Sequence, residues 1–213
     1  MAVDAFGALR EAIMLGELAP GTPLRLEELA RSLGMSISPV REALRHLEVQ
    51  GLAEYAPYRG ARVTELSHEE MIEIYEARRA LEATAARRAA KRFTSDDHEV
   101  LAKALAQADL GYSRGDRLLV VRSNTAFHAG IAAASQSQWL QRLLNPLLEM
   151  SERYAAAVLR TEQTTKTRKL ERSGHLRILK ALDARDPKAA EAGVLDHLDV
   201  FEAHYGSGLA AEA

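Results

Sequence analysis

Apolar residues recur at helical spacing along most of this 213-residue chain, and their pattern divides it into two regions. Glycine and proline interrupt the first 66 residues often, whereas the stretches after Ser67 are long and rich in alanine and leucine. Ser67 and Glu70 have the spacing of a capping box, which predicts the start of a helix. We therefore predict one domain over residues 1–66, a second over 67–206 and a frayed tail at 207–213.

The first region predicts a small domain of helices followed by a hairpin. Its helices are expected at residues 5–15, 26–33 and 38–50, and its two strands at 52–56 and 61–64. The second region predicts helices alone. They are expected at residues 68–92, 95–111, 116–134, 137–160, 163–185 and 187–205, with a kink at Pro146.

Residues 28–47 have the spacing of a helix-turn-helix. Ala30 is small where two helices would cross, and Gly34 suits the turn between them. With the hairpin that follows, this pattern predicts a winged helix-turn-helix. The fold class is therefore mainly α, an N-terminal winged helix-turn-helix plus a C-terminal all-α antiparallel six-helix bundle.

The second helix of this motif carries candidate DNA contacts. Ser36, Ser38, Arg41 and Arg45 are predicted to project outward, and Arg59 lies at the hairpin tip as a wing residue. Hydroxyls at a helix N-terminus suit phosphate, and arginine reads guanine in the major groove. The alternative is a helical subdomain with incidental surface arginines, but the complete motif spacing and the hairpin favour DNA binding.

Composition limits the classes of function. The chain has no cysteine, which excludes a thiolate metal site and a cysteine nucleophile. It has no secretory signal pattern and no 18-residue apolar stretch, so we expect a cytoplasmic protein without a membrane span. Charge does not indicate nucleic acid, because residues 1–66 hold seven arginines against nine acidic residues. DNA binding must therefore rest on local pattern.

Three histidines fall on apolar faces of three different predicted helices. They are His128, His175 and His197, and Asn124 lies one turn before His128. A single inward histidine is usually a core residue with one hydrogen bond. Three of them with an amide oxygen form a candidate metal site if the bundle brings them together.

Arg78 lies on the apolar stripe of the first helix of the second region. A buried guanidinium needs an anionic partner. That partner is either Glu82, one turn further along the helix, or the carboxylate of a bound effector.

The stretch LARSLGMSISPVREALRHL, from Leu29 to Leu47, resembles the winged helix of the GntR family of bacterial transcription regulators. The continuation YRGARV, from Tyr58 to Val63, is similar to the family's wing. Ile37 stands where the family often has arginine, so we expect one DNA contact to be missing or replaced. The resemblance implies a homodimeric regulator that binds double-stranded operator DNA, expected to act as a repressor.

The second region resembles the ligand-sensing FCD domain of the FadR subfamily, in its VanR-like six-helix branch. The matching pieces are YEARRALE from Tyr75, NTAFH from Asn124, HLRI from His175, and His197-Leu198. The resemblance implies that Asn124, His128, His175 and His197 bind a divalent metal, with zinc or nickel expected, and that Arg78 binds a small organic acid. Asn124 occupies a position where the family also uses aspartate, so less negative charge faces the metal here.

Two other functions fit part of the pattern. A metalloenzyme would use the three histidines and an activated water, but no acidic residue lies one turn from His128 on its own helix, and the winged helix would have no role. An architectural DNA-binding protein with an inert bundle would bind no metal and respond to no small molecule. We therefore predict a regulator and not an enzyme.

Overall fold

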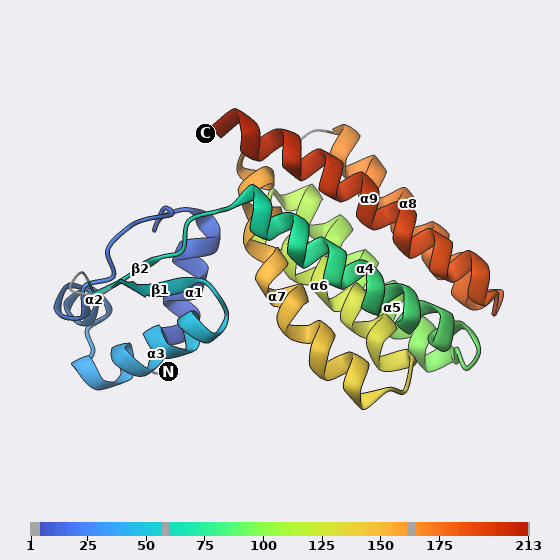
Figure 1. The fold of residues 1–213 in the computed structure, drawn as a ribbon, viewed down its shortest axis with the longest axis horizontal. Helices are drawn as coiled ribbons and strands as arrows, with labels where there is room; N and C mark the ends of the chain where they lie inside the picture. The colour runs from blue at the N-terminus through green and yellow to red at the C-terminus, as the bar shows by residue number, and fades with distance from the viewer. Residues whose placement is uncertain (1–4, 57–59, 162–164, 213) are drawn as a thin grey trace. The chain divides into compact units, whose positions relative to one another are not determined.

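The computed structural model describes residues 5–56, 60–161 and 165–212. The chain divides into two compact units, Met1–Ser67 and His68–Ala213 (Figure 1). Each unit has its own core, and the first contains every strand of the described chain.

The first unit is a helix-turn-helix followed by a two-stranded wing. Its elements are α1 (Ala5–Leu15), α2 (Leu26–Leu33), α3 (Ile37–Val49), β1 (Ala53–Ala56) and β2 (Gly60–Val63). The strands are antiparallel, with Ala53 opposite Val63. Val40, Leu44 and Leu47 recur every three or four residues on α3, so they share one face, and all three are fully buried. These elements begin and end within one residue of the predicted positions.

The turn between α2 and α3 depends on a glycine. Gly34 ends α2 with a φ of 64°, in the left-handed region that glycine adopts without steric cost. The next residue, Met35, donates its N–H to the carbonyl of Ala30 at 2.9 Å. Ala30 itself is buried. The small residue and the glycine therefore occupy the crossing and the turn that their spacing predicted.

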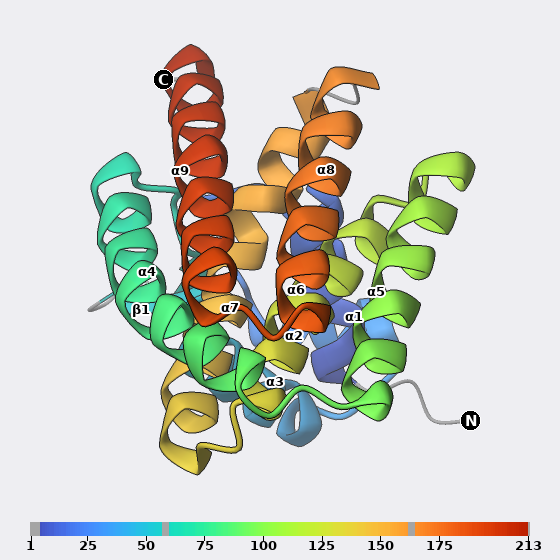
Figure 2. The same ribbon diagram turned by 90° about the vertical axis from the view of Figure 1, so that its right-hand side faces the viewer.

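The second unit is an all-helical bundle, as predicted. Its elements are α4 (His68–Ala90), α5 (Ser95–Arg114), α6 (Arg117–Ala134), α7 (Gln138–Thr161), α8 (Thr165–Asp183) and α9 (Pro187–Glu212). Helix α4 packs against α6, α7 and α9, while α5 packs against α6 and α8 packs against α9 (Figure 2). Helices α6, α8 and α9 therefore all pack against α4.

The ends of these helices follow local capping chemistry. Asp186 accepts the backbone N–H groups of Lys188 and Ala189, each at 3.0 Å, and so caps α9 with Pro187 at its first position. At its other end, α9 extends to Glu212, beyond the helix end predicted at residue 205. The alanines of this segment favour helix enough to continue it past its two glycines.

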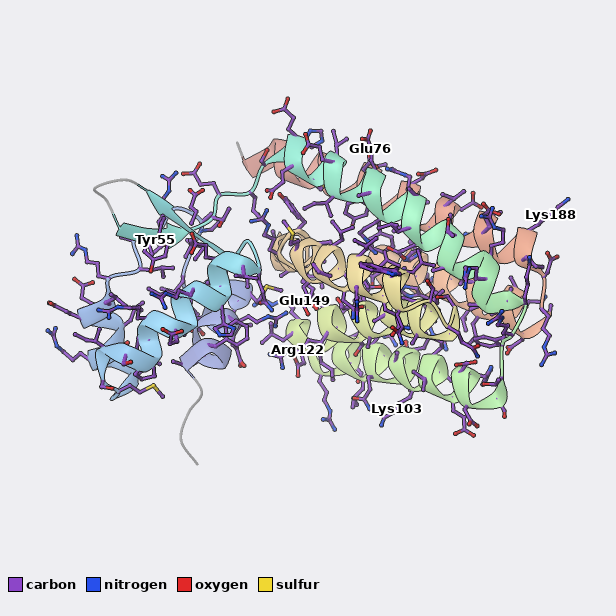
Figure 3. The ribbon with its side chains drawn as sticks, turned by 60° about the horizontal axis from the view of Figure 1, so that its bottom comes forward. Tyr55, Glu76, Lys103, Arg122, Glu149 and Lys188 are labelled. Atoms are coloured by element: carbon purple, nitrogen blue, oxygen red, sulfur yellow. The ribbon has the colours of Figure 1, made fainter. Side chains whose placement is uncertain are left out.

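The outer faces of the bundle carry many charged side chains. Glu76 on α4, Lys103 on α5 and Lys188 on α9 project away from the helices (Figure 3). Among the described helices, none has the length and apolar character needed to cross a membrane. The inward faces of the bundle, although mostly apolar, also hold buried titratable side chains.

Candidate functional site

Three buried histidines meet in the interior of the bundle. His128 comes from α6, His175 from α8 and His197 from α9. Each offers one ring nitrogen, and these three nitrogens lie within 4.8 Å of one another. The Nε2 atoms of His128 and His175 are 3.4 Å apart. The fold thus brings together the histidines that the sequence placed on three separate apolar faces.

The distance between the Nε2 atoms of His128 and His175 is compatible with two arrangements. Two nitrogens bound to one tetrahedral zinc ion, each about 2.0–2.1 Å from it, lie about 3.3–3.4 Å apart. The same separation also allows one hydrogen bond between two neutral rings. The donor set therefore fits a divalent metal without movement of these two rings.

The electrostatic surroundings keep two of these rings neutral. Burial lowers the pKa of His175 well below its ordinary value, and the neighbouring His128 lowers it further. Burial also lowers the pKa of His197, with His175 and His128 adding to the effect. A neutral imidazole has a free lone pair, which is the form that binds a metal.

Asn124 adds a candidate oxygen ligand one turn before His128. Its Oδ1 atom is buried and has no hydrogen-bond partner among the described residues. Leaving a buried acceptor unsatisfied costs about 1–3 kcal/mol. A cation bound at Oδ1 would remove this cost, so the amide oxygen also fits the metal hypothesis.

Glu82 orients one of the histidines, a role that the sequence analysis missed. Its Oε2 lies 2.5 Å from Nδ1 of His128, and both side chains are buried. Burial raises the pKa of Glu82, but Arg78 and His128 outweigh it and lower the pKa to about 2. Because the ionised carboxylate can only accept, Nδ1 of His128 carries the hydrogen and Nε2 faces the other rings.

Arg78 forms an ion pair with Glu82, which was one of its two predicted partners. Its Nε donates to Oε1 of Glu82 at 2.7 Å, and its Nη1 donates to the hydroxyl of Ser151 on α7 at 3.0 Å. The guanidinium carbon also lies 4.9 Å from the ring centre of Tyr75. Arg78 is buried and does not itself belong to the histidine cluster. Glu82 connects the two, because it contacts both Arg78 and His128.

Another buried carboxyl, that of Glu171, lies on α8, one turn before His175. Glu171 accepts a hydrogen bond from the hydroxyl of Tyr112 on α5. Burial raises the pKa of Glu171 to about 7, although the Tyr112 hydrogen bond lowers it in part. Helical periodicity alone does not indicate that Glu171 lies against Tyr112 of another helix.

The candidate DNA contacts of α3 lie on its exposed face. Ser36, Ser38, Arg41 and Arg45 are all exposed, and Arg45 donates to Glu42 at 3.0 Å. Ser36 is the N-cap residue, yet its side chain makes no capping bond within the described chain. Arg59, the fifth predicted contact, lies outside the described residues.

Two protein families match this chain. Residues 2–63 match the family described as bacterial regulatory proteins, gntR family, and residues 73–200 match the FCD domain. The first match spans the winged unit and the second spans the helices that carry the histidine cluster.

Individual relatives match along nearly the whole chain. It is 32% identical over 203 residues to the "Probable D-xylose utilization operon transcriptional repressor" of Paenarthrobacter nicotinovorans, covering 93% of this chain and 87% of that protein. It is also 32% identical over 207 residues to the "HTH-type transcriptional regulator LutR" of Bacillus subtilis, covering 88% and 93%. Each alignment therefore spans most of both chains.

Solved structures share the same fold. The McbR/YncC protein of Escherichia coli aligns with a TM-score of 0.80 at 24% identity, over 96% of each chain. A putative GntR transcriptional regulator from Rhodococcus sp. RHA1 aligns with a TM-score of 0.78 at 25% identity, over 94% of each chain. The likeness to McbR/YncC establishes the arrangement of the helices.

Proposed function

Since this chain belongs to the GntR family of bacterial transcription regulators and carries an FCD domain, we propose that its bundle binds a divalent metal and a small carboxylate effector that together control operator binding. The matched families and relatives are transcription regulators and not enzymes. The observation that carries the proposal is the buried group of three histidines. One turn before His128 on α6, the buried Oδ1 of Asn124 has no hydrogen-bond partner among the described residues, which supports it.

The proposed metal ligands are His128, His175, His197 and Asn124, with zinc or nickel as the ion. Imidazole and amide oxygen suit these ions, and no thiolate competes for them because the chain has no cysteine. The proposed ligands are imidazole and amide groups, which bring no negative charge to the metal. The opposite charges of Glu82 and Arg78 offset each other in an ion pair. The charge of a bound cation would therefore remain available to attract an anion.

We assign Arg78 to the carboxylate of the effector. A guanidinium presents five N–H donors in a planar fork, which matches a carboxylate. Arg78 already binds the carboxylate of Glu82 and the hydroxyl of Ser151, so an effector would join an existing polar network. A bound metal would supply a Lewis acid for another oxygen of the same small organic acid.

For the first unit, we propose operator binding by a homodimer in the bacterial cytoplasm. Two α3 helices would enter major grooves about 34 Å apart, one helical turn of DNA. The proposed contacts are Ser36, Ser38, Arg41, Arg45 and Arg59. A relative is described as a repressor of a D-xylose utilization operon, and we propose repression here as well.

The metal proposal is tested by calorimetric titration of chelator-treated protein with zinc and with nickel. We expect one site per chain in the wild type and its loss in the His128→Ala/His175→Ala double variant. A His98→Ala variant is the control, because that histidine is exposed and pairs with Asp183. Equal binding by wild type and double variant would overturn the site, and no binding by either would favour an inert bundle.

The DNA proposal is tested by selecting bound fragments of the source genome with the purified protein. We expect an inverted repeat, and we expect Arg41→Ala and Arg45→Ala each to cost about 1–3 kcal/mol of binding to it. Lys188→Ala is the matched control, since it removes an exposed positive charge from the bundle. Wild-type affinity in both arginine variants would show that α3 does not read the operator.

A further inference from the structure

Gly174 lies on α8 next to the Nδ1 edge of the His197 ring on α9. A Cβ atom at this position would lie 2.5 Å from Nδ1 of His197 and 3.4 Å from its Cγ. Separations below 3.0 Å essentially never occur for real Cβ atoms. Any side chain larger than hydrogen at residue 174 must therefore move either the His197 ring or the two helices relative to each other.

The His197 ring has little room to move away. His175 lies 4.3 Å from it, His128 lies 5.2 Å away in a stacked arrangement, and Phe201 lies 4.7 Å away, measured between ring centres. The side chain of His197 is buried, with 3% of the residue exposed. A displaced ring would have to push the other two histidines or leave the cluster.

The backbone gives no separate reason for glycine at this position. Gly174 lies inside α8, and its φ is not among the positive values of the described glycines. Glycine weakens the interior of a helix relative to alanine, so alanine would be favoured there if space allowed. The close approach of the His197 ring is the feature that requires a residue without Cβ.

We infer that Gly174 is a positioning residue for the metal site, because it lets the His197 ring lie against the backbone of α8. This inference rests on the proposed metal site. It goes beyond the ligand set, since Gly174 supplies no ligand atom. The site thus depends on the distance between α8 and α9 as well as on the identity of the ligands.

The test compares Gly174→Ala with Gly193→Ala, a control in the same pair of helices. A Cβ at residue 193 would lie 3.3 Å from Cγ1 of Ile178 and would touch no histidine. Zinc affinity is measured by calorimetry on the chelator-treated full chain. We expect Gly174→Ala to bind zinc about 10- to 100-fold more weakly, the usual effect of disturbing ligand orientation. We expect Gly193→Ala to bind zinc like wild type.

A double variant separates positioning from general damage. In a His197→Ala background the ring is gone, so adding Gly174→Ala should not weaken zinc binding further. The same addition should raise the melting temperature of the metal-free protein, since alanine stabilises a helix. If Gly174→Ala alone fails to fold, recovery of folding in the double variant supports the same contact.

Two results would overturn the inference while leaving the metal site intact. One is wild-type zinc affinity in Gly174→Ala when His197→Ala loses affinity. The other is an equal loss of affinity from Gly174→Ala with and without His197. If His197→Ala itself binds zinc like wild type, the proposed metal site fails instead.

Discussion

At the scale of single residues, Glu82 connects the histidine cluster to Arg78. One carboxylate oxygen accepts from Nδ1 of His128 and the other accepts from Nε of Arg78. A histidine ligand is usually oriented in this way by a carboxylate or carbonyl behind it. Glu82 therefore couples the proposed metal site and the proposed effector site through one side chain.

Replacing Glu82 by glutamine should weaken both the orientation of His128 and the ion pair with Arg78. Zinc affinity, measured by calorimetry, is expected to fall about 10- to 100-fold because His128 loses its charged acceptor. The free energy of unfolding should fall by up to about 3–5 kcal/mol, since Arg78 loses its buried counter-charge. Glu76→Gln, on the exposed face of the same helix, should change neither quantity. Wild-type zinc affinity in Glu82→Gln would remove the orienting role.

Ile37 lies at the start of α3, at the position where we expect the family to have arginine more often. Its side chain is 40% exposed at the start of the helix, between Ser36 and Ser38. An apolar group on a recognition helix can contact the methyl group of thymine. We therefore expect Ile37 to replace a polar DNA contact with an apolar one.

This expectation can be tested on the selected operator by replacing thymine with uracil, one base at a time. At the base read by Ile37, loss of the methyl group should cost wild type about 0.8 kcal/mol, or about fourfold in affinity. Gel-shift titration of Ile37→Ala should show no such loss at that base. The same loss in both proteins at every thymine would exclude the contact.

At the scale of helices, α5 and α8 are joined by the partly buried hydrogen bond that the Tyr112 hydroxyl donates to Glu171. Asp109 lies three residues before Tyr112 on α5. It accepts hydrogen bonds from Arg168 and Arg172 of α8, at 3.2 and 3.0 Å. A carboxyl shielded from water between two helices favours its neutral form. The contact between α5 and α8 should therefore depend on pH.

The sign of this dependence follows from the pKa of Glu171, which burial raises from 4.5 to about 7. Between these values the folded protein keeps a proton that the unfolded chain releases, so stability falls as pH rises through this range. Relative to Glu171→Gln, wild type should lose up to about 3 kcal/mol between pH 4.5 and pH 8. Urea unfolding of both proteins at several pH values measures this difference. If the free energy of unfolding depends on pH in the same way in wild type and in Glu171→Gln, Glu171 does not hold the extra proton.

At the scale of the whole molecule, the two compact units have separate cores, and the histidine cluster belongs to the second. A ligand that binds only the folded bundle stabilises it by mass action, by about 2.7 kcal/mol at a concentration 100 times its dissociation constant. The winged unit contributes none of the proposed ligands. Metal should therefore stabilise the two units unequally.

Hydrogen exchange of the full chain, with and without zinc, resolves the two units by peptide. We expect slower exchange in α6, α8 and α9 and unchanged exchange in α2 and α3, in the absence of DNA and effector. The His128→Ala/His175→Ala variant should show no response anywhere. Equal slowing in both units would mean that they open as one cooperative body.

Local sequence alone predicted the helices, the wing and the inward faces of the histidines. Apolar periodicity, Gly34 in a turn and Asp186-Pro187 at a helix start act over a few residues, so their consequences can be read along the chain. The last helix was predicted to end at residue 205, before Gly206, whereas α9 continues to Glu212.

The geometry of the candidate site was decided by tertiary packing. Helical spacing identified Glu82 as a partner for Arg78, but only the approach of α4 and α6 places its second oxygen on His128. Likewise, only the crossing of α8 and α9 gives Gly174 a reason to lack a side chain. The physical cause is that periodicity determines which face of a helix is buried. The distance between two buried side chains depends on how closely helices from distant parts of the chain pack.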